Sequence, residues 1–268
     1  MSDSMKWISP MTALLLAMAP AAFAAETLAS GTFSHDEWTT VLQKYVDTQG
    51  LVDYESLAKD RAVLDSYLAK IHTISPRSHP DLFPTRNAQL AYYINAYNAL
   101  VFEGVLSRGP EKKSVWRGLI SGLNFFVLMK VDVGGESVSL KHLEDEWIRA
   151  GFEDPRIHAA LNCASISCPR LPQVAFSAEN LDAELDAAMR EFVADPRNFK
   201  IDDAKETVYL SEIFDFFPKD FLDYEKKNGN SDPNLIDYAN RYRDAGAKAP
   251  RDFRIKFFKY DKGINSQP

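Results

Sequence analysis

Residues 85–106, TRNAQLAYYINAYNALVFEGVL, predict an amphipathic helix, and the rest of the chain can be understood outward from it. At about 100° per residue, its apolar side chains form one narrow stripe, made by Leu90, Ile94, Tyr97 and Val101. Asn95 and Asn98 flank this buried face. Because an amide beside a core must find hydrogen-bond partners, these two asparagines either tie down neighbouring backbone or point into a pocket.

The remaining chain interleaves further helices with β-hairpins. Gly134-Gly135 is a typical two-residue hairpin turn. Helices are predicted over residues 34–46, 55–71, 85–106, 140–150 and 177–193, from 211 to a stop at Pro218, and from Asp232-Pro233 onward, and strands over 125–133, 136–139, 198–201, 207–210 and 253–260. Neither a regular strand–helix–strand period nor a glycine-rich phosphate loop occurs. The sequence therefore predicts a single α+β domain over residues 25–268, with several helices around a small, mostly antiparallel sheet.

One carboxylate departs from the amphipathic pattern of the predicted helix 140–150. Glu144 falls inside the apolar arc that Leu140, Trp147 and Ile148 define, whereas Asp145 and Arg149 lie outside it. A carboxylate on a buried face must be paired or protonated. Glu144 is therefore a candidate site residue.

The first residues have the pattern of a signal peptide. Residues 11–23 are apolar but too short to span a bilayer, and they end in Ala22-Phe23-Ala24. We expect cleavage near Ala24/Ala25 and a periplasmic or secreted protein without a membrane span in its mature chain. Translation could start at Met1 or at Met5, and Met5 would give the more basic start that signal peptides favour.

The net charge of −7 argues against nucleic acid as the main partner. Charge is nevertheless uneven, because residues 241–262 hold eight Lys or Arg against three Asp. This basic end is either a solvated face or a contact for an anionic polymer or lipid.

Reactive side chains concentrate in residues 156–171, RIHAALNCASISCPRL, which hold both cysteines of the chain. A cysteine attacks as its thiolate and needs a neighbouring base or cation. If residues 156–161 form a short buried strand, Arg156 and His158 share one face, and the following loop can bring Cys163 to the imidazole. Glu144 could then orient His158 or pair with Arg156, and the asparagines could orient the ring or stabilise an oxyanion.

Two alternatives use the same residues. His158, Cys163 and Cys168, with or without Glu144, could bind a metal, although H-x4-C-x4-C matches no common zinc pattern. A Cys163–Cys168 disulfide is favoured if the protein is exported, and it would shape a loop more than hold the fold together.

Several motifs resemble the bacterial and plant family known as domain of unknown function 547 (DUF547). They are Val52-Asp53-Tyr54, residues 91–100 (AYYINAYNAL), Ser139 to Glu144, Arg156 to Pro169, Leu210 to Phe221, and Tyr260-Asp261-Lys262. The resemblance covers nearly all of the mature chain and implies a family more than an activity. A helix followed by a histidine-bearing strand is also similar to the papain and transglutaminase group, in which the cysteine heads the helix instead of following the histidine.

Our leading hypothesis is a cysteine-dependent hydrolase or acyl transferase without a cofactor. The catalytic candidates are Cys163, His158, Glu144 and Asn98, and the substrate-binding candidates are Asn95, Arg156, Tyr97 and Cys168. Its ligand would be a small molecule, a peptide or an envelope polymer. The alternative is a non-enzymatic periplasmic binding or scaffold module with a Cys163–Cys168 disulfide.

Overall fold

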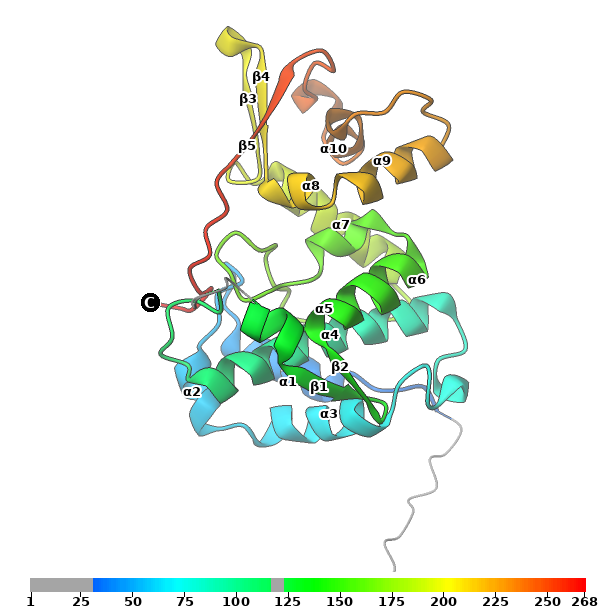
Figure 1. Ribbon diagram of the computed structural model, residues 1–268, viewed down its shortest axis with the longest axis vertical. Coiled ribbons are helices and arrows are strands. Elements are labelled where there is room, and N and C mark those ends of the chain that lie inside the picture. The colour runs from blue at the N-terminus through cyan, green and yellow to red at the C-terminus, as the bar shows by residue number, and fades with distance from the viewer. Residues whose placement is uncertain (1–30, 117–122) are drawn as a thin grey trace, which may run out of the picture. The chain divides into compact units, whose positions relative to one another are not determined.

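Helices and short strands are interspersed along the chain, which confirms the predicted α+β class (Figure 1). The structure, a computed structural model, describes residues 31–116 and 123–268. The predicted signal peptide, its cleavage site and both candidate start residues lie outside these ranges. No helix in the described ranges is both long and apolar enough to cross a membrane.

The helix α4 (Arg86–Arg108) runs through the larger of two hydrophobic clusters and is buried over most of its length. Thr85 caps it by accepting a hydrogen bond from the backbone N–H of Ala88. The helices α1 (Asp36–Tyr45), α2 (Tyr54–Lys59) and α3 (Ala62–Thr73) pack around it, and the hairpin of β1 (Lys130–Val133) and β2 (Glu136–Ser139) packs against α3. The predicted helix 55–71 is thus two helices, because α2 ends at Asp60, whose carboxylate bonds to Lys44 and Tyr45 of α1.

The second cluster surrounds a three-stranded sheet of β3 (Phe199–Asp202), β4 (Thr207–Leu210) and β5 (Arg254–Phe257). The predicted hairpin of β3 and β4 is antiparallel, whereas β5 joins β4 in parallel. The helices that complete this part are α7 (Leu181–Ala194), α8 (Glu212–Phe216), α9 (Pro218–Lys227) and α10 (Leu235–Arg241). The helix predicted from residue 211 to a stop at Pro218 is α8, which ends at Phe216. Pro218 itself begins α9, because proline is favoured at the first helical position.

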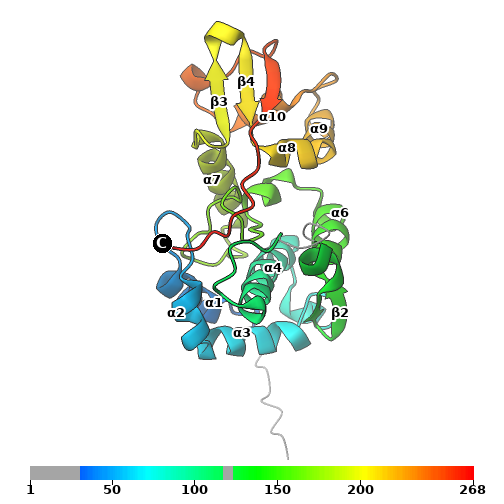
Figure 2. The same cartoon turned by 60° about the vertical axis from the view of Figure 1, so that its left-hand side comes forward.

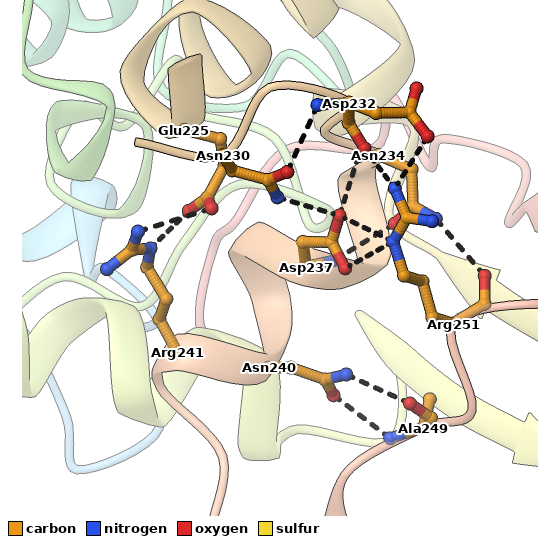
Figure 3. Close-up of polar contacts among 9 residues, drawn as sticks. All are labelled: Glu225, Asn230, Asp232, Asn234, Asp237, Asn240, Arg241, Ala249 and Arg251. Atoms are coloured by element: carbon orange, nitrogen blue, oxygen red, sulfur yellow. Dashed lines mark hydrogen bonds and ion pairs between the residues drawn. The ribbon is translucent and has the colours of Figure 1, made fainter. Parts of the chain in front are cut away.

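A polar network fixes the segment that leads from α10 into β5 (Figure 3). The buried carboxylate of Glu225 pairs with Arg241, and Arg251 bonds to Asp237 at 3.1 Å. The side chain of Asn240 exchanges two hydrogen bonds of 2.9 Å with the backbone of Ala249. These contacts hold the start of β5, so that the chain beyond it enters the site from a defined position.

After β5 the chain returns toward the start of α2 (Figure 2). Ser266 forms a parallel bridge with Val52, and the N–H of Gln267 bonds to the carbonyl of Val52 at 2.9 Å. On the way, Tyr260 is held because its N–H donates to Glu212 Oε2 at 2.8 Å.

Two predicted strand segments are helical. Residues 156–161, predicted as a strand, lie mainly in a 3-10 helix (Pro155–Ala159), because Pro155 stands at its first position and Asp154 accepts a hydrogen bond from the N–H of Arg156. The first part of the predicted strand 125–133 is a π-helix (Leu123–Leu128). Runs this short carry too little periodicity to distinguish a strand from a helix.

Candidate functional site

The two asparagines of α4 hold the loop that carries the cysteines. Asn98 donates to the carbonyl of Ala160 and accepts from the N–H of Asn162, both at 2.9 Å. Asn95 exchanges the same pair of bonds with Phe176, at 2.8 and 3.1 Å. Of the two roles that the sequence left open, the geometry is that of a backbone tether, and neither asparagine is on the wall of the cavity described below.

The cysteine loop brings the two thiols together at the junction of the two hydrophobic clusters. Cys163 Sγ and Cys168 Sγ are free thiols 2.6 Å apart, a little beyond the bonded S–S distance of about 2.05 Å. The hydroxyl of Tyr260 lies 3.2 Å from the first sulfur and 3.1 Å from the second. The thiol of Cys163 donates to Ser165 Oγ at 3.6 Å, and Ser165 Oγ also accepts from Trp116 Nε1 at 2.7 Å.

These contacts make the two thiols chemically unequal. Hydrogen bonds with Cys168, and also with Tyr260 and Ser165, outweigh burial and lower the pKa of Cys163. Burial raises the pKa of Cys168, and the neighbouring Cys163 adds to this shift. Cys163 is also the less buried of the pair. It is therefore the sulfur that can act as a thiolate nucleophile.

A histidine near the two thiols pairs with a carboxylate. His158 Nε2 is 2.8 Å from Asp220 Oδ2, and its ring stacks on Phe217 with the centroids 4.3 Å apart. Burial raises the pKa of Asp220, but hydrogen bonds from His158 and Arg149 outweigh it and hold that pKa well below its ordinary value. Burial lowers the pKa of His158 despite the opposing effect of Asp220.

The ionisation of this pair follows from those shifts. A neutral imidazole that donates from Nε2 to a carboxylate keeps its lone pair on Nδ1. No described residue forms a hydrogen bond to Nδ1. Asp220 therefore orients the His158 ring and leaves Nδ1 able to accept a proton, whereas Glu144, the partner that the sequence suggested, forms no hydrogen bond to it.

Glu144 has a different partner. Its Oε2 accepts a hydrogen bond from the hydroxyl of Tyr97 at 2.9 Å, and the residue lies in the π-helical segment Leu143–Arg149 between α5 (Leu140–His142) and α6 (Ala150–Phe152). Burial raises the pKa of Glu144, although the bond from Tyr97 opposes the shift. Glu144 is thus a carboxyl group that can exchange a proton closer to neutral pH than an exposed glutamate.

Most of these groups line one cavity of about 330 Å³, but the asparagines, Ser165, Arg149 and Asp220 do not. The polar side chains of its wall are Tyr97, Lys141, Glu144, Asp145, His158, Cys163, Cys168 and Tyr260, and much of the rest is apolar. No hydrogen bond between described atoms joins Cys163 directly to His158. The two face a shared space, so a substrate or a water molecule would have to stand between them.

Arg156 lies apart from this cavity. Its guanidinium binds Asp154 at 2.7 Å, Asp182 at 2.8 Å and Asp186 at 2.9 Å, and it makes no pair with Glu144. Arg156 therefore ties the 3-10 helix to α7.

The described residues offer no set of ligands for the metal site that the sequence left open. Among residues 31–116 and 123–268, no group of three or more His, Cys, Asp or Glu side chains is arranged to hold a metal ion.

Three residues of the site were not predicted from the sequence: Tyr260 and Trp116, which line the cavity, and Asp220, which pairs with His158. Asp220 and Tyr260 lie in motifs that the sequence singled out, but 62 residues separate Asp220 from His158 and 97 separate Tyr260 from Cys163. Only the packing of the two clusters brings them together.

Comparison with known proteins agrees with the sequence motifs. Residues 82–193 match the family described as "Protein of unknown function, DUF547", which confirms the resemblance. The matched region holds the asparagine tethers, Glu144, His158 and both cysteines, and it ends before Asp220 and Tyr260. No curated protein and no solved structure matches the chain.

Proposed function

We propose that this chain, whose residues 82–193 match the DUF547 family, is a cysteine-dependent hydrolase or acyl transferase with Cys163 as its nucleophile. One observation carries the proposal: a thiol of lowered pKa and an Asp220-oriented His158 line the same cavity. A nucleophile, a base and a group that orients the base are the parts of a covalent acyl-transfer site.

The reaction would proceed through a thioester. Cys163 Sγ attacks the carbonyl carbon of an ester, amide or thioester, and the thiol proton passes to Nδ1 of His158, with Asp220 stabilising the imidazolium. The carbon–heteroatom bond breaks, and the leaving group takes this proton. Water or an acceptor hydroxyl then attacks the thioester, His158 removes its proton, and that proton returns to the Cys163 thiolate as the acyl group leaves.

Two further groups on the cavity wall support the same chemistry. The hydroxyl of Tyr260 stabilises the thiolate by donating to it at 3.2 Å. Glu144, whose pKa burial raises, supplies a second proton-exchanging group beside the thiol. In this proposal Asn98 is a positioning residue, because it acts through the backbone of the cysteine loop.

The test is to trap the thioester. Reduced protein is incubated with p-nitrophenyl esters of graded chain length, and the acyl adduct is located by intact and peptide mass spectrometry. We expect the adduct on Cys163, its loss in Cys163→Ser, and acylation slower by about 100-fold in His158→Ala. His142→Ala is the matched control, since His142 is an exposed histidine on α5 outside the cavity. Acyl groups found only on surface lysines, at a rate unaffected by Cys163→Ser, would contradict the proposal.

We also propose that the protein is exported, as the pattern of residues 11–24 indicates. N-terminal sequencing of protein from the periplasmic and culture-medium fractions tests this. A mature chain that starts near Ala25 supports export, and an intact Met1 or Met5 start in all fractions contradicts it.

A second candidate function rests on the 2.6 Å separation of the two sulfurs. In an oxidising compartment such a pair can form a disulfide, and the protein would then be a binding or scaffold module without a nucleophile. The cavity would still accept a ligand, but no thioester would form.

A further inference from the structure

The residues beside the cavity bear on what its substrate is. A cleft of about 680 Å³ adjoins the cavity, and the two share Trp116 and Tyr260 in their walls. Three lysines line this cleft: Lys113, Lys259 and Lys262. All three are exposed.

These lysines carry charge that the protein does not neutralise. The lysine ion pairs in the described ranges all involve other lysines. One carboxylate, Asp261, also lines the cleft, and its Oδ1 accepts a hydrogen bond from the N–H of Gly263 at 2.8 Å. Three ammonium groups and one carboxylate give the cleft a net charge of +2.

Most other cations of the basic end have internal roles. Arg241 and Arg251 are bound by acidic partners around α10, as Figure 3 shows, and Arg243 donates to the carbonyls of Ala247 and Val193. Lys259 and Lys262, in contrast, converge with Lys113, which lies almost 150 residues earlier in the chain. If the basic end were only a solvated face, nothing would require three lysines from distant parts of the chain to line one cleft.

The cleft is built on fixed backbone. The N–H of Ile264 donates to the carbonyl of Lys113 at 2.9 Å, and Ser114 Oγ donates to the carbonyl of Lys262. The N–H of Ile166, in the cysteine loop, donates to the carbonyl of Gly263 at 2.8 Å. The position of the lysines relative to Cys163 is therefore set by direct hydrogen bonds.

The cavity itself favours an apolar group. Phe126, Phe217 and Leu161 line it, together with Val127 and Phe216, which are exposed by 36% and 49%. Trp116 lies between the two spaces, and Lys262 Nζ is 4.9 Å from the centre of its ring. Apolar side chains that stay exposed at the wall of a cavity are typical of a site for an apolar ligand.

We infer that the substrate is an anionic amphiphile, whose hydrocarbon chain occupies the cavity and whose phosphate or carboxylate binds Lys113, Lys259 and Lys262. The inference rests on the proposed function in one respect: the carbonyl that Cys163 attacks would lie between the hydrocarbon chain and the anionic group of the substrate. Lysine ammonium groups bind phosphate as point charges through charge-assisted hydrogen bonds.

The test is calorimetric titration with three unreactive probes below their micelle concentrations: decyl phosphate, decyl glucoside and inorganic phosphate. We expect decyl phosphate to bind at least about tenfold more tightly than either other probe. The Lys113→Gln, Lys259→Gln, Lys262→Gln triple variant should lose this preference and keep its affinity for decyl glucoside. The control is the Lys59→Gln, Lys200→Gln, Lys248→Gln triple variant, which changes the net charge of the protein by the same amount. These three lysines are exposed and line neither the cavity nor the cleft.

Three outcomes would overturn the inference: equal binding of decyl phosphate and decyl glucoside, equal loss in the control triple, or binding to anionic phospholipid vesicles without binding to decyl phosphate. The last would indicate a membrane-surface contact and not a substrate site. Because the probes cannot acylate a thiol, Cys163→Ser should bind them like the wild type. The binding result would therefore stand even if no thioester were trapped, and a trapped thioester would stand even if decyl phosphate did not bind.

Discussion

Replacing Tyr260 by phenylalanine removes the hydroxyl that lies 3.2 Å from Cys163 Sγ and 3.1 Å from Cys168 Sγ. The ring keeps its packing, because only the oxygen is lost. We expect the pKa of Cys163 to rise, since one of the hydrogen bonds that favour its thiolate disappears.

The size of the rise follows from the geometry. A hydrogen bond to a charged group contributes about 1.5–3 kcal/mol, and one pKa unit corresponds to about 1.36 kcal/mol. The hydroxyl is shared between two sulfurs, and the bonds with Cys168 and Ser165 stay in place. The lower end of that range applies, so the expected rise is about one unit.

The assay is the pH dependence of Cys163 alkylation by iodoacetamide in fully reduced protein, followed by peptide mass spectrometry. Only the thiolate reacts, so the midpoint of the rate profile reports the pKa. Tyr209→Phe is the control, since the ring of Tyr209 packs on Phe258 and does not line the cavity. A Tyr260→Phe midpoint equal to that of the wild type would refute the assignment of Tyr260 as a thiolate-stabilising donor.

Three further predictions concern the residues around the thiol. Asn98→Ala leaves the carbonyl of Ala160 and the N–H of Asn162 unpaired, so urea unfolding should show a loss of about 2–4 kcal/mol; a loss below about 1 kcal/mol would show that water replaces the tether. Asp220→Asn should destabilise the fold most near neutral pH. The folded-state pKa of Asp220 is depressed, so its carboxylate stabilises the fold above the unfolded pKa of about 3.9, and the difference between wild type and variant should shrink as pH falls below that value. A pH-independent difference in unfolding free energies would contradict this. Arg156→Gln should lower the melting temperature, because it leaves Asp154 without its cation, while Cys163 alkylates at the wild-type rate; slower alkylation would show that Arg156 reaches the site.

Local patterns account for the parts of the fold that the sequence predicted. The helix α4 follows from its apolar periodicity and the Thr85 cap, and the β1–β2 hairpin follows from Gly134 and Gly135, whose φ values are 61° and 82°. The failures are two short segments, the 3-10 helix at Pro155–Ala159 and the π-helix at Leu123–Leu128. Segments of five or six residues carry too little periodicity to distinguish a strand from a helix, so tertiary packing selects their conformation.

Some residues of the candidate site could likewise be predicted from local sequence, and others could not. Cys163 and His158 could be predicted because reactive side chains concentrate in residues 156–171, and Glu144 because a carboxylate stands out on the apolar face of a predicted helix. Asp220 and Tyr260 could not be assigned, since an aspartate early in a helix and a tyrosine near the end of the chain look ordinary. Their roles depend on contacts between the two hydrophobic clusters. The asparagines were recognised as unusual, but only the structure distinguishes a tether from a pocket residue.

The oxidation state of Cys163 in its native compartment tests the central claim most directly. Mature protein is alkylated under denaturing conditions without and with reductant, and its mass is compared. A free nucleophile predicts that Cys163 is alkylated without reductant and that, in the folded protein, it reacts much faster than Cys168, with the preference lost in His158→Ala. A quantitative Cys163–Cys168 disulfide in every preparation would contradict the account.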